Sequence, residues 1–188
     1  MKALTRIPPV EPPYDPETEQ MLRKWMPPGA DVEPLTLFRV LAQHPGLMSR
    51  MRPLGAGILG STTVEPRERE LMILRTTALN GAYYEWGVHA TAFGPSVGIG
   101  DDDARAIAAG RTEGFGEGDR LVLRLADELH AESRVSDELW AELQNTHTLP
   151  QIIELITTAG WYRLLSYVIN AAELDPEPWA TASPAPSA

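Results

Sequence analysis

A glutamate and a histidine stand four residues apart in the stretch NGAYYEWGVHATA, which spans residues 80–92. Residues i and i+4 of a helix lie on one face, so the side chains of Glu85 and His89 can touch if this stretch is helical. A carboxylate beside an imidazole favours the protonated ring and fixes its orientation. The pair could therefore act as a general acid or base near neutral pH. The alternative is an ordinary ion pair on a solvated helix face.

The residues around this pair favour a buried location. The helix would be apolar over much of its circumference, because it also carries Trp86, Val88, Ala90, Ala92 and Phe93. Buried charges need partners, and they often mark functional sites.

The upstream run EPREREL offers a further partner for the pair. Acidic residues in the first turn of a helix interact favourably with the helix dipole, and this accounts for Glu65 and Glu68. Glu70 stands beside Leu71 and one turn before Leu74, so we expect its side chain to point inward.

These residues form the predicted catalytic site. We expect His89 to transfer a proton, Glu85 to orient its ring and Glu70 to serve as a second acid or base. The candidates to line the substrate pocket are the neighbouring aromatic residues Tyr83, Tyr84 and Trp86. Proton transfer by such groups needs no metal and no organic cofactor, so we expect neither.

Several other chemistries are excluded or disfavoured by the sequence. There are no cysteines, so disulfides, thiolate metal sites and thiol redox chemistry are ruled out. No two histidines have the spacing of metal ligands, and no Gly-x-Ser-x-Gly turn is present for a triad hydrolase. The glycine-rich stretch GRTEGFGEG follows no strand and has no Gly-Lys-Ser/Thr, so we interpret it as a loop.

The overall charge argues against two classes of partner. The chain has 26 acidic and 16 basic residues among 188 and a net charge of -10. Such a chain has no electrostatic attraction for nucleic acid or for an anionic membrane. No apolar run has the length of a membrane-spanning helix, and the first residues lack the apolar core of a secretory signal. We therefore expect a cytoplasmic protein that acts on a small molecule.

The hydrophobic pattern predicts a single all-α domain over residues 15–175, between a proline-rich extended arm (1–14) and a flexible tail (176–188). No segment has the period of a strand. A core-packing role is expected for Trp161, Tyr162 and Tyr167 of the last helix. The predicted helices cover residues 15–26, 34–44, 46–59, 66–79, 83–97, 101–109, 119–132, 136–145 and 149–174.

The run RERELMILRTTALNGAYYEWGVHATAFGPSVGI, followed by an acidic helix start, resembles the carboxymuconolactone decarboxylase-like superfamily, which includes the alkylhydroperoxidase D-like proteins. The match covers about Val64 to Ala109, and the last helix is similar to the family's C-terminal element. The resemblance implies an all-helical fold built around an antiparallel helix pair. It also implies assembly as a homo-oligomer, either trimer or hexamer, with sites between helices.

The chain departs from the peroxidase branch of this superfamily at two positions. The resemblance implies a pair of reactive cysteines at Ala82 and Glu85, ahead of His89. Without sulfur there is no nucleophile to attack a peroxide and no disulfide to recycle. The decarboxylase branch instead carries a Glu-x-x-x-His pair and an upstream Arg-Glu-Leu run, which here is residues 69–71.

The resemblance therefore implies a cofactor-independent acid/base enzyme of the carboxymuconolactone decarboxylase type, acting on a small organic acid or lactone. One alternative is a non-catalytic member in which the Glu/His cluster is a buried structural network. A third possibility, an alkylhydroperoxidase or peroxiredoxin-like activity, is disfavoured by the absence of cysteine.

Overall fold

A computed structural model describes residues 5–27, 32–60, 62–181 and 184. These residues form nine α-helices and one 3-10 helix and contain no strand, which confirms the all-α prediction. Within the same ranges, no helix is both long and apolar enough to cross a membrane. The elements are α1 (Pro16–Arg23), α2 (Thr36–Leu41), α3 (Pro45–Gly60), α4 (Pro66–Leu79), α5 (Tyr83–Ala92), η1 (Gly94–Val97), α6 (Asp101–Ala108), α7 (Glu117–Glu132), α8 (Asp137–Thr146) and α9 (Leu149–Ala172).

The helices begin where the sequence supplies caps. Asp15 accepts hydrogen bonds from the backbone N–H groups of residues 17 and 18 at the start of α1, both at 3.0 Å. At the start of α9, Gln151 Oε1 accepts from the backbone N–H of Thr148 at 2.9 Å, and the two residues form a capping box.

One helix ends earlier than the sequence suggests. We predicted a continuous helix to Val97, but α5 ends at Ala92 and the chain continues as the 3-10 helix η1. The cause is Pro95, whose ring would clash with a carbonyl one turn earlier in an α-helix. Gly94 fits this change of direction, because a Cβ there would lie 3.0 Å from the backbone oxygen of Ile99.

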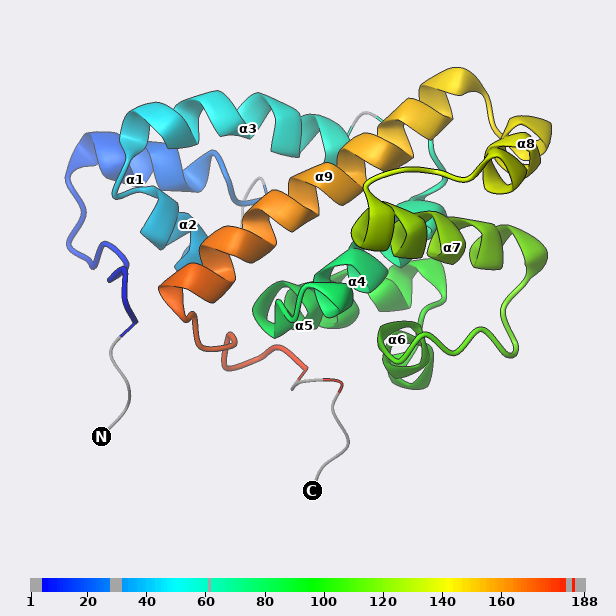
Figure 1. The fold of residues 1–188 in the computed structure, drawn as a ribbon. Coiled ribbons are helices and arrows are strands. Elements are labelled where there is room, and N and C mark those ends of the chain that lie inside the picture. The colour runs from blue at the N-terminus through cyan, green and yellow to red at the C-terminus, as the bar shows by residue number, and fades with distance from the viewer. Residues whose placement is uncertain (1–4, 28–31, 61, 182–183, 185–188) are drawn as a thin grey trace.

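Helix α4 lies at the centre of the molecule and packs against α5, α6, α7 and α9 (Figure 1). Both α4 and α5 contribute to two hydrophobic clusters. Leu74 and Trp86 belong to the cluster formed with α6, α7 and α8, whereas Ile73 and Tyr84 belong to the cluster formed with α2 and α3. The antiparallel pair α4–α5 is therefore held from both sides, which fixes the side chains that lie between the two helices.

The N-terminal arm packs against the helices. From residue 5 to the start of α1 it forms no helix, but the N–H of Arg6 donates to the carbonyl of Ala172 at 2.9 Å. The N–H of Val10 donates to the carbonyl of Arg39 at 3.1 Å. The arm thus lies across α2 and the end of α9.

The segment after α9 also makes specific contacts. Glu177 Oε1 accepts hydrogen bonds from the N–H of Thr36 at 2.6 Å and from the hydroxyl of Tyr84 at 2.5 Å. The N–H of Thr181 donates to Thr91 Oγ1 at 2.7 Å. The packed part of the chain therefore extends beyond the boundary at residue 175 that the composition suggests.

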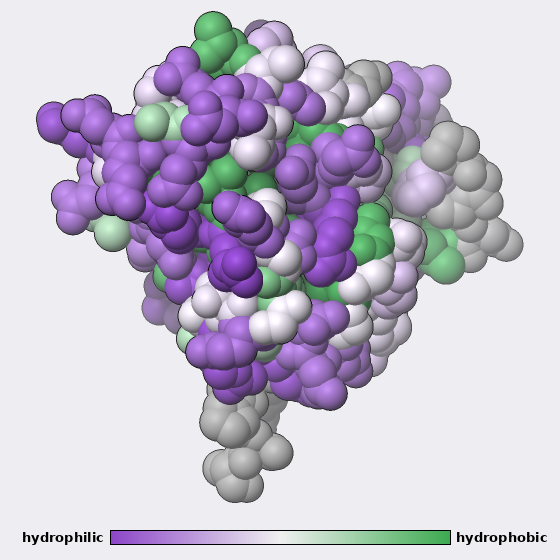
Figure 2. Space-filling model, turned by 90° about the vertical axis from the view of Figure 1, so that its right-hand side faces the viewer, coloured by the Kyte–Doolittle hydropathy of each residue, from purple (hydrophilic) through white to green (hydrophobic). Residues whose placement is uncertain are grey.

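Helix α9 carries a second apolar face that the rest of the described chain does not cover. The helix crosses the molecule in front of α4, beside α3 (Figure 1). Its exposed apolar residues are Leu149, Ile153, Leu164 and Tyr167, which are 43–63% exposed and repeat at helical spacing. On the face seen in Figure 2, at the α6–α8 end, hydrophilic side chains predominate instead.

The predicted core role of two aromatic residues of α9 is confirmed, since Trp161 and Tyr162 are 7% and 2% exposed. The same prediction is wrong for Tyr167, which is 59% exposed. Helical periodicity identifies apolar faces but does not tell which of two such faces meets the core.

Candidate functional site

The α4–α5 pair brings the three predicted catalytic residues together. Glu70 Oε2 lies 2.7 Å from His89 Nδ1, and Glu85 Oε1 lies 3.6 Å from His89 Nε2. Glu70 is fully buried and His89 is 2% exposed, so the expectation that Glu70 points inward is confirmed. The imidazole therefore lies between two carboxylates, one from each helix.

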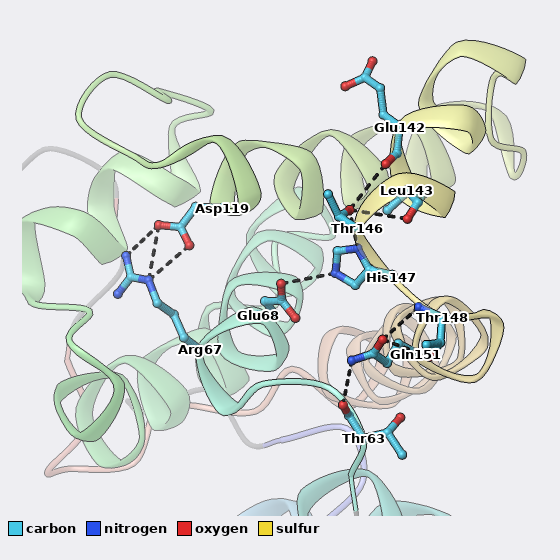
Figure 3. A network of polar contacts seen from close by, with 10 residues as sticks. All are labelled: Thr63, Arg67, Glu68, Asp119, Glu142, Leu143, Thr146, His147, Thr148 and Gln151. Atoms are coloured by element: carbon cyan, nitrogen blue, oxygen red, sulfur yellow. Dashed lines mark hydrogen bonds and ion pairs between the residues drawn. The ribbon is translucent and has the colours of Figure 1, made fainter.

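The four residues of the sequence RERE (67–70) point to two different sides of α4. Arg67 Nη2 binds Asp119 of α7 at 2.8 Å, and Glu68 contacts His147 Nε2 at 3.2 Å, just before α9 (Figure 3). These contacts fix α4 against α7 and the α8–α9 connection. The next two residues of the run contact each other on the side of α5, where Glu70 reaches the imidazole.

Arg69 extends the cluster by one more charge. Its Nε donates to Glu70 Oε1 at 3.3 Å, and its side chain is 12% exposed. Glu70 thus accepts hydrogen bonds on both oxygens, one from Arg69 and one from His89. These two contacts fix the position of the carboxylate and, through it, the orientation of the ring.

Two aromatic residues form the walls around the imidazole. Phe93 stacks on the His89 ring with centroids 4.7 Å apart, and Tyr162 of α9 meets the ring edge-on at 5.0 Å. We did not predict either contact. Phe93 follows His89 by four residues, so its place on the same face could have been inferred. Tyr162 lies far from His89 in the sequence, so no local sequence pattern predicts their contact.

The charge of the imidazole follows from its neighbours. Burial works to lower the pKa of His89, but the charge and hydrogen bond of Glu70, followed by those of Glu85, raise it to about 9. The ring is therefore protonated at neutral pH. It forms a buried ion pair with Glu70 and keeps its second nitrogen directed at Glu85.

Glu85 is incompletely satisfied. Its Oε2 is buried and accepts no hydrogen bond from the residues that the structure describes. A buried polar atom without a partner is costly, and such atoms often mark a place where a proton or a ligand binds. The free oxygen of Glu85 can therefore accept a hydrogen bond or a proton. Both oxygens of Glu70 are already hydrogen-bonded.

The three aromatic residues predicted to line a pocket lie elsewhere. Tyr83 is 39% exposed at the start of α5, and Trp86 is fully buried in the cluster with α6, α7 and α8. The hydroxyl of Tyr84 accepts from the N–H of Leu37 at 3.0 Å and donates to Glu177. Their positions on α5 turn them away from the Glu85–His89 face, so we assign the walls of the site to Phe93 and Tyr162 instead.

The site is a closed contact within the single chain. A pocket of about 970 Å³ lies between the N-terminal arm and the segment after α9, away from the imidazole. The Glu85 side chain is 8% exposed, whereas those of His89 and Glu70 are 3% and 0% exposed. In the described ranges, no cluster of three or more His, Cys, Asp or Glu side chains could hold a metal ion.

Comparisons with known proteins identify the fold. No protein-family model and no curated protein matches the chain. An uncharacterized peroxidase-related protein from Silicibacter sp. TM1040 superposes with a TM-score of 0.77 at 16% identity, over 95% of this chain and 96% of that one. An uncharacterized peroxidase-related protein from Ralstonia eutropha JMP134, with an alkylhydroperoxidase AhpD core, gives 0.75 at 17% identity, over 95% of both chains.

A protein of unknown function from Agrobacterium tumefaciens matches less of the chain, with a TM-score of 0.66 at 14% identity over 73% of this chain and 94% of that one. At these identities the comparisons establish fold and not activity. The chain has the alkylhydroperoxidase D core fold, as its motifs predict. It has this fold without any cysteine.

Proposed function

We propose that the protein is a cofactor-independent acid/base enzyme of the carboxymuconolactone decarboxylase type, acting on a small organic acid or lactone. The observation that carries this proposal is a buried, protonated histidine between two carboxylates, one of which keeps a free oxygen. Loss of carbon dioxide leaves an electron pair on carbon, and that carbon must receive a proton. A buried His/Glu pair can supply it.

The geometry supports an exchange of the roles expected from the sequence. Glu70 is bonded on both oxygens and holds His89 Nδ1, so it is the residue that orients the ring. Glu85 faces His89 Nε2 and has the unsatisfied oxygen, so it is the second acid or base. In the proposed step Glu85 delivers a proton to the substrate carbon. The protonated imidazole, which faces Glu85 through Nε2, stabilises the carboxylate that Glu85 becomes.

The test is turnover of a panel of carboxylated lactones and unsaturated acids, followed as carbon dioxide release. We expect His89→Gln to lower the rate by about 100-fold or more, the usual contribution of a positioned acid or base. The matched control is His44→Gln, since His44 is exposed and lies outside the site. Equal rates in the wild type and His89→Gln would refute the proposal, provided that circular dichroism shows both chains folded.

One observation favours the alternative of a structural network, namely the closed packing around Glu70 and His89. The two functions differ in what they predict for Glu85→Gln. A structural network would lose thermal stability, because a charged partner of His89 is removed. In the catalytic account the variant should also lose turnover, whereas a structural network has no turnover to lose.

A peroxidase activity is raised by the family resemblance and by the names of the structural neighbours. A sulfur-free chain offers no thiolate nucleophile, so we rank this function below the other two. Consumption of a hydroperoxide in the presence of a dithiol reductant would revive it.

We also propose that the chain forms a homo-oligomer, trimer or hexamer, through the apolar face of α9. Leu54 of α3 and Ile153 of α9 line one shared hollow, so the apolar residues of the two helices are continuous. Soluble monomers rarely expose large contiguous apolar patches. A second copy would cover this face with like residues, as symmetric interfaces do.

A further inference from the structure

Arg69 lies at the site with most of its hydrogen-bonding groups unused. Its side chain is 12% exposed, and in the part of the chain that the structure describes it makes one hydrogen bond, from Nε to Glu70. On the same helix, Arg67 donates from all three nitrogens, to Asp119 and to two backbone carbonyls. The two terminal nitrogens of Arg69 are therefore left for another partner.

Arg69 and the free oxygen of Glu85 belong to the same small region. Both residues are linked to the imidazole, Arg69 through Glu70 and Glu85 directly. Both also act on the phenol of Tyr162. Burial raises the pKa of Tyr162, the negative charges of Glu85 and then Glu70 raise it further, and Arg69 lowers it.

The cluster is electrically balanced when it is empty. Two positive charges, on Arg69 and the protonated His89, offset two negative charges, on Glu70 and Glu85. An anionic ligand would add a third negative charge to a buried site. Uncompensated buried charge is strongly unfavourable, so the site must gain a proton when an anion enters.

We propose that the terminal nitrogens of Arg69 bind the carboxylate of the substrate, and that Glu85 takes up one proton in the same step. This inference rests on the proposed function, and it commits that function to the anion of a carboxylic acid rather than a neutral lactone. The planar guanidinium of arginine matches a carboxylate with two parallel hydrogen bonds.

Glu85 is the group that can accept the proton. The charged and titratable side chains around it are His89 and Tyr84 on its own helix, Glu70 and Arg69 on α4, and Tyr162 on α9. Glu70 already accepts two hydrogen bonds, and His89 carries its proton before the ligand arrives. Of the two carboxylates in this cluster, only Glu85 has an oxygen that accepts no hydrogen bond from the described residues.

The proton balance closes over the reaction. Decarboxylation of a carboxylate consumes one proton, since RCOO⁻ and H⁺ give RH and CO₂. The bond between the carboxyl carbon and its neighbour breaks, and its electron pair takes the proton from Glu85 to form the new C–H bond. Glu85 returns to a carboxylate as carbon dioxide leaves, so the proton taken up on binding is the one consumed.

The experiment is isothermal titration calorimetry of the full chain with benzoate, in two buffers that differ in ionisation enthalpy. Benzamide is the neutral control ligand. We expect benzoate to bind with uptake of about one proton and benzamide to bind at least about tenfold more weakly. One coupled proton also predicts that benzoate affinity falls about tenfold per unit from about pH 6 to about pH 8.

Variants separate the two parts of the inference. Arg69→Gln and Arg69→Lys should each weaken benzoate binding by about tenfold or more, because both lose the two-point contact. Arg105→Gln removes the same charge from an exposed side chain and should bind as the wild type does. Glu85→Gln should bind benzoate with no proton uptake and no dependence on pH over that range.

Three results would overturn the inference. These are equal affinity for benzoate and benzamide, no binding of benzoate at millimolar concentration by the folded wild type, and unchanged proton uptake in Glu85→Gln. Benzoate is not turned over, so the result does not depend on decarboxylase activity. A chain that binds benzoate as expected but releases no carbon dioxide from any substrate would refute the proposed function and leave the anion site intact.

Discussion

His89 and Glu70 form a buried ion pair, and the stability of the fold should report it. The pKa of His89 is raised from 6.5 to about 9 in the folded chain. A raised pKa means that the folded state binds the proton more tightly than the unfolded chain does. The protonated His89 therefore contributes its full stabilisation of the fold below pH 6.5, and this stabilisation is lost as the pH rises through about 9.

This residue-scale prediction is checked by melting temperatures measured across that pH range. We expect the wild type to lose thermal stability from neutral to alkaline pH, and His89→Gln to lose less over the same interval. His44→Gln should retain the wild-type slope, because His44 is exposed and outside the cluster. Identical slopes in the wild type and His89→Gln would mean that the ring is neutral in the folded chain.

The residue types of the site could be predicted from the sequence, but their roles could not. The i,i+4 spacing places Glu85 near His89, and the inward direction of Glu70 follows from its apolar neighbours. Which carboxylate holds the ring depends on a difference of 2.7 Å against 3.6 Å, set by the packing of α4 on α5. Arg69 was missed as a partner because the sequence does not show which donors of an arginine stay unused.

At the scale of elements, α5 is held by the segment that follows α9. A Cβ added to Gly87 would lie 2.5 Å from the backbone oxygen of Thr181. Gly87→Ala should therefore displace that segment or destabilise the fold by about 1–3 kcal/mol, the usual cost of overpacking. Chemical denaturation measures this loss.

The matched control is Gly118→Ala in α7, where an added Cβ meets nothing within 4 Å. Alanine has the higher helix propensity, so this variant should be unchanged or stabilised by up to about 1 kcal/mol. If both variants change stability by the same amount, the contact between α5 and the segment after α9 does not constrain the helix.

The positions of the helices were largely predictable, because caps and prolines mark their ends. The errors have physical causes. Pro95 ends α5 early, and Tyr167 lies on an apolar face that the rest of the described chain leaves uncovered. The contacts of Glu177 and Thr181 could not be foreseen, since a proline- and alanine-rich composition says nothing of individual hydrogen bonds to α2 and α5.

At the scale of the whole molecule, the apolar face of α9 predicts self-association. Ile153 is 63% exposed, more than the other apolar residues of this face. Ile153→Glu places a charge where the proposed interface would exclude water, and burying an unpaired charge is strongly unfavourable. We expect the wild type to sediment as a trimer or hexamer and the variant as a monomer with the same helix content.

The control for this experiment is Gln144→Glu, which adds the same charge at an exposed position of α8. It should assemble as the wild type does. A wild type that stays monomeric at every concentration, or an Ile153→Glu variant that assembles normally, would rule out α9 as the interface. The fold itself was predictable from the motifs, whereas the assembly depends on which apolar face stays free, and the sequence does not reveal that.

The central claim is proton delivery to carbon by His89 and Glu85. The most direct measurement is NMR of reactions run in D₂O with carboxylated lactones labelled with ¹³C in the carboxyl group. The wild type should release the label as ¹³CO₂ and leave one deuterium on the product carbon, and His89→Gln should do neither at a measurable rate. Release of the label by both proteins, or by neither for every compound tested, would contradict the account.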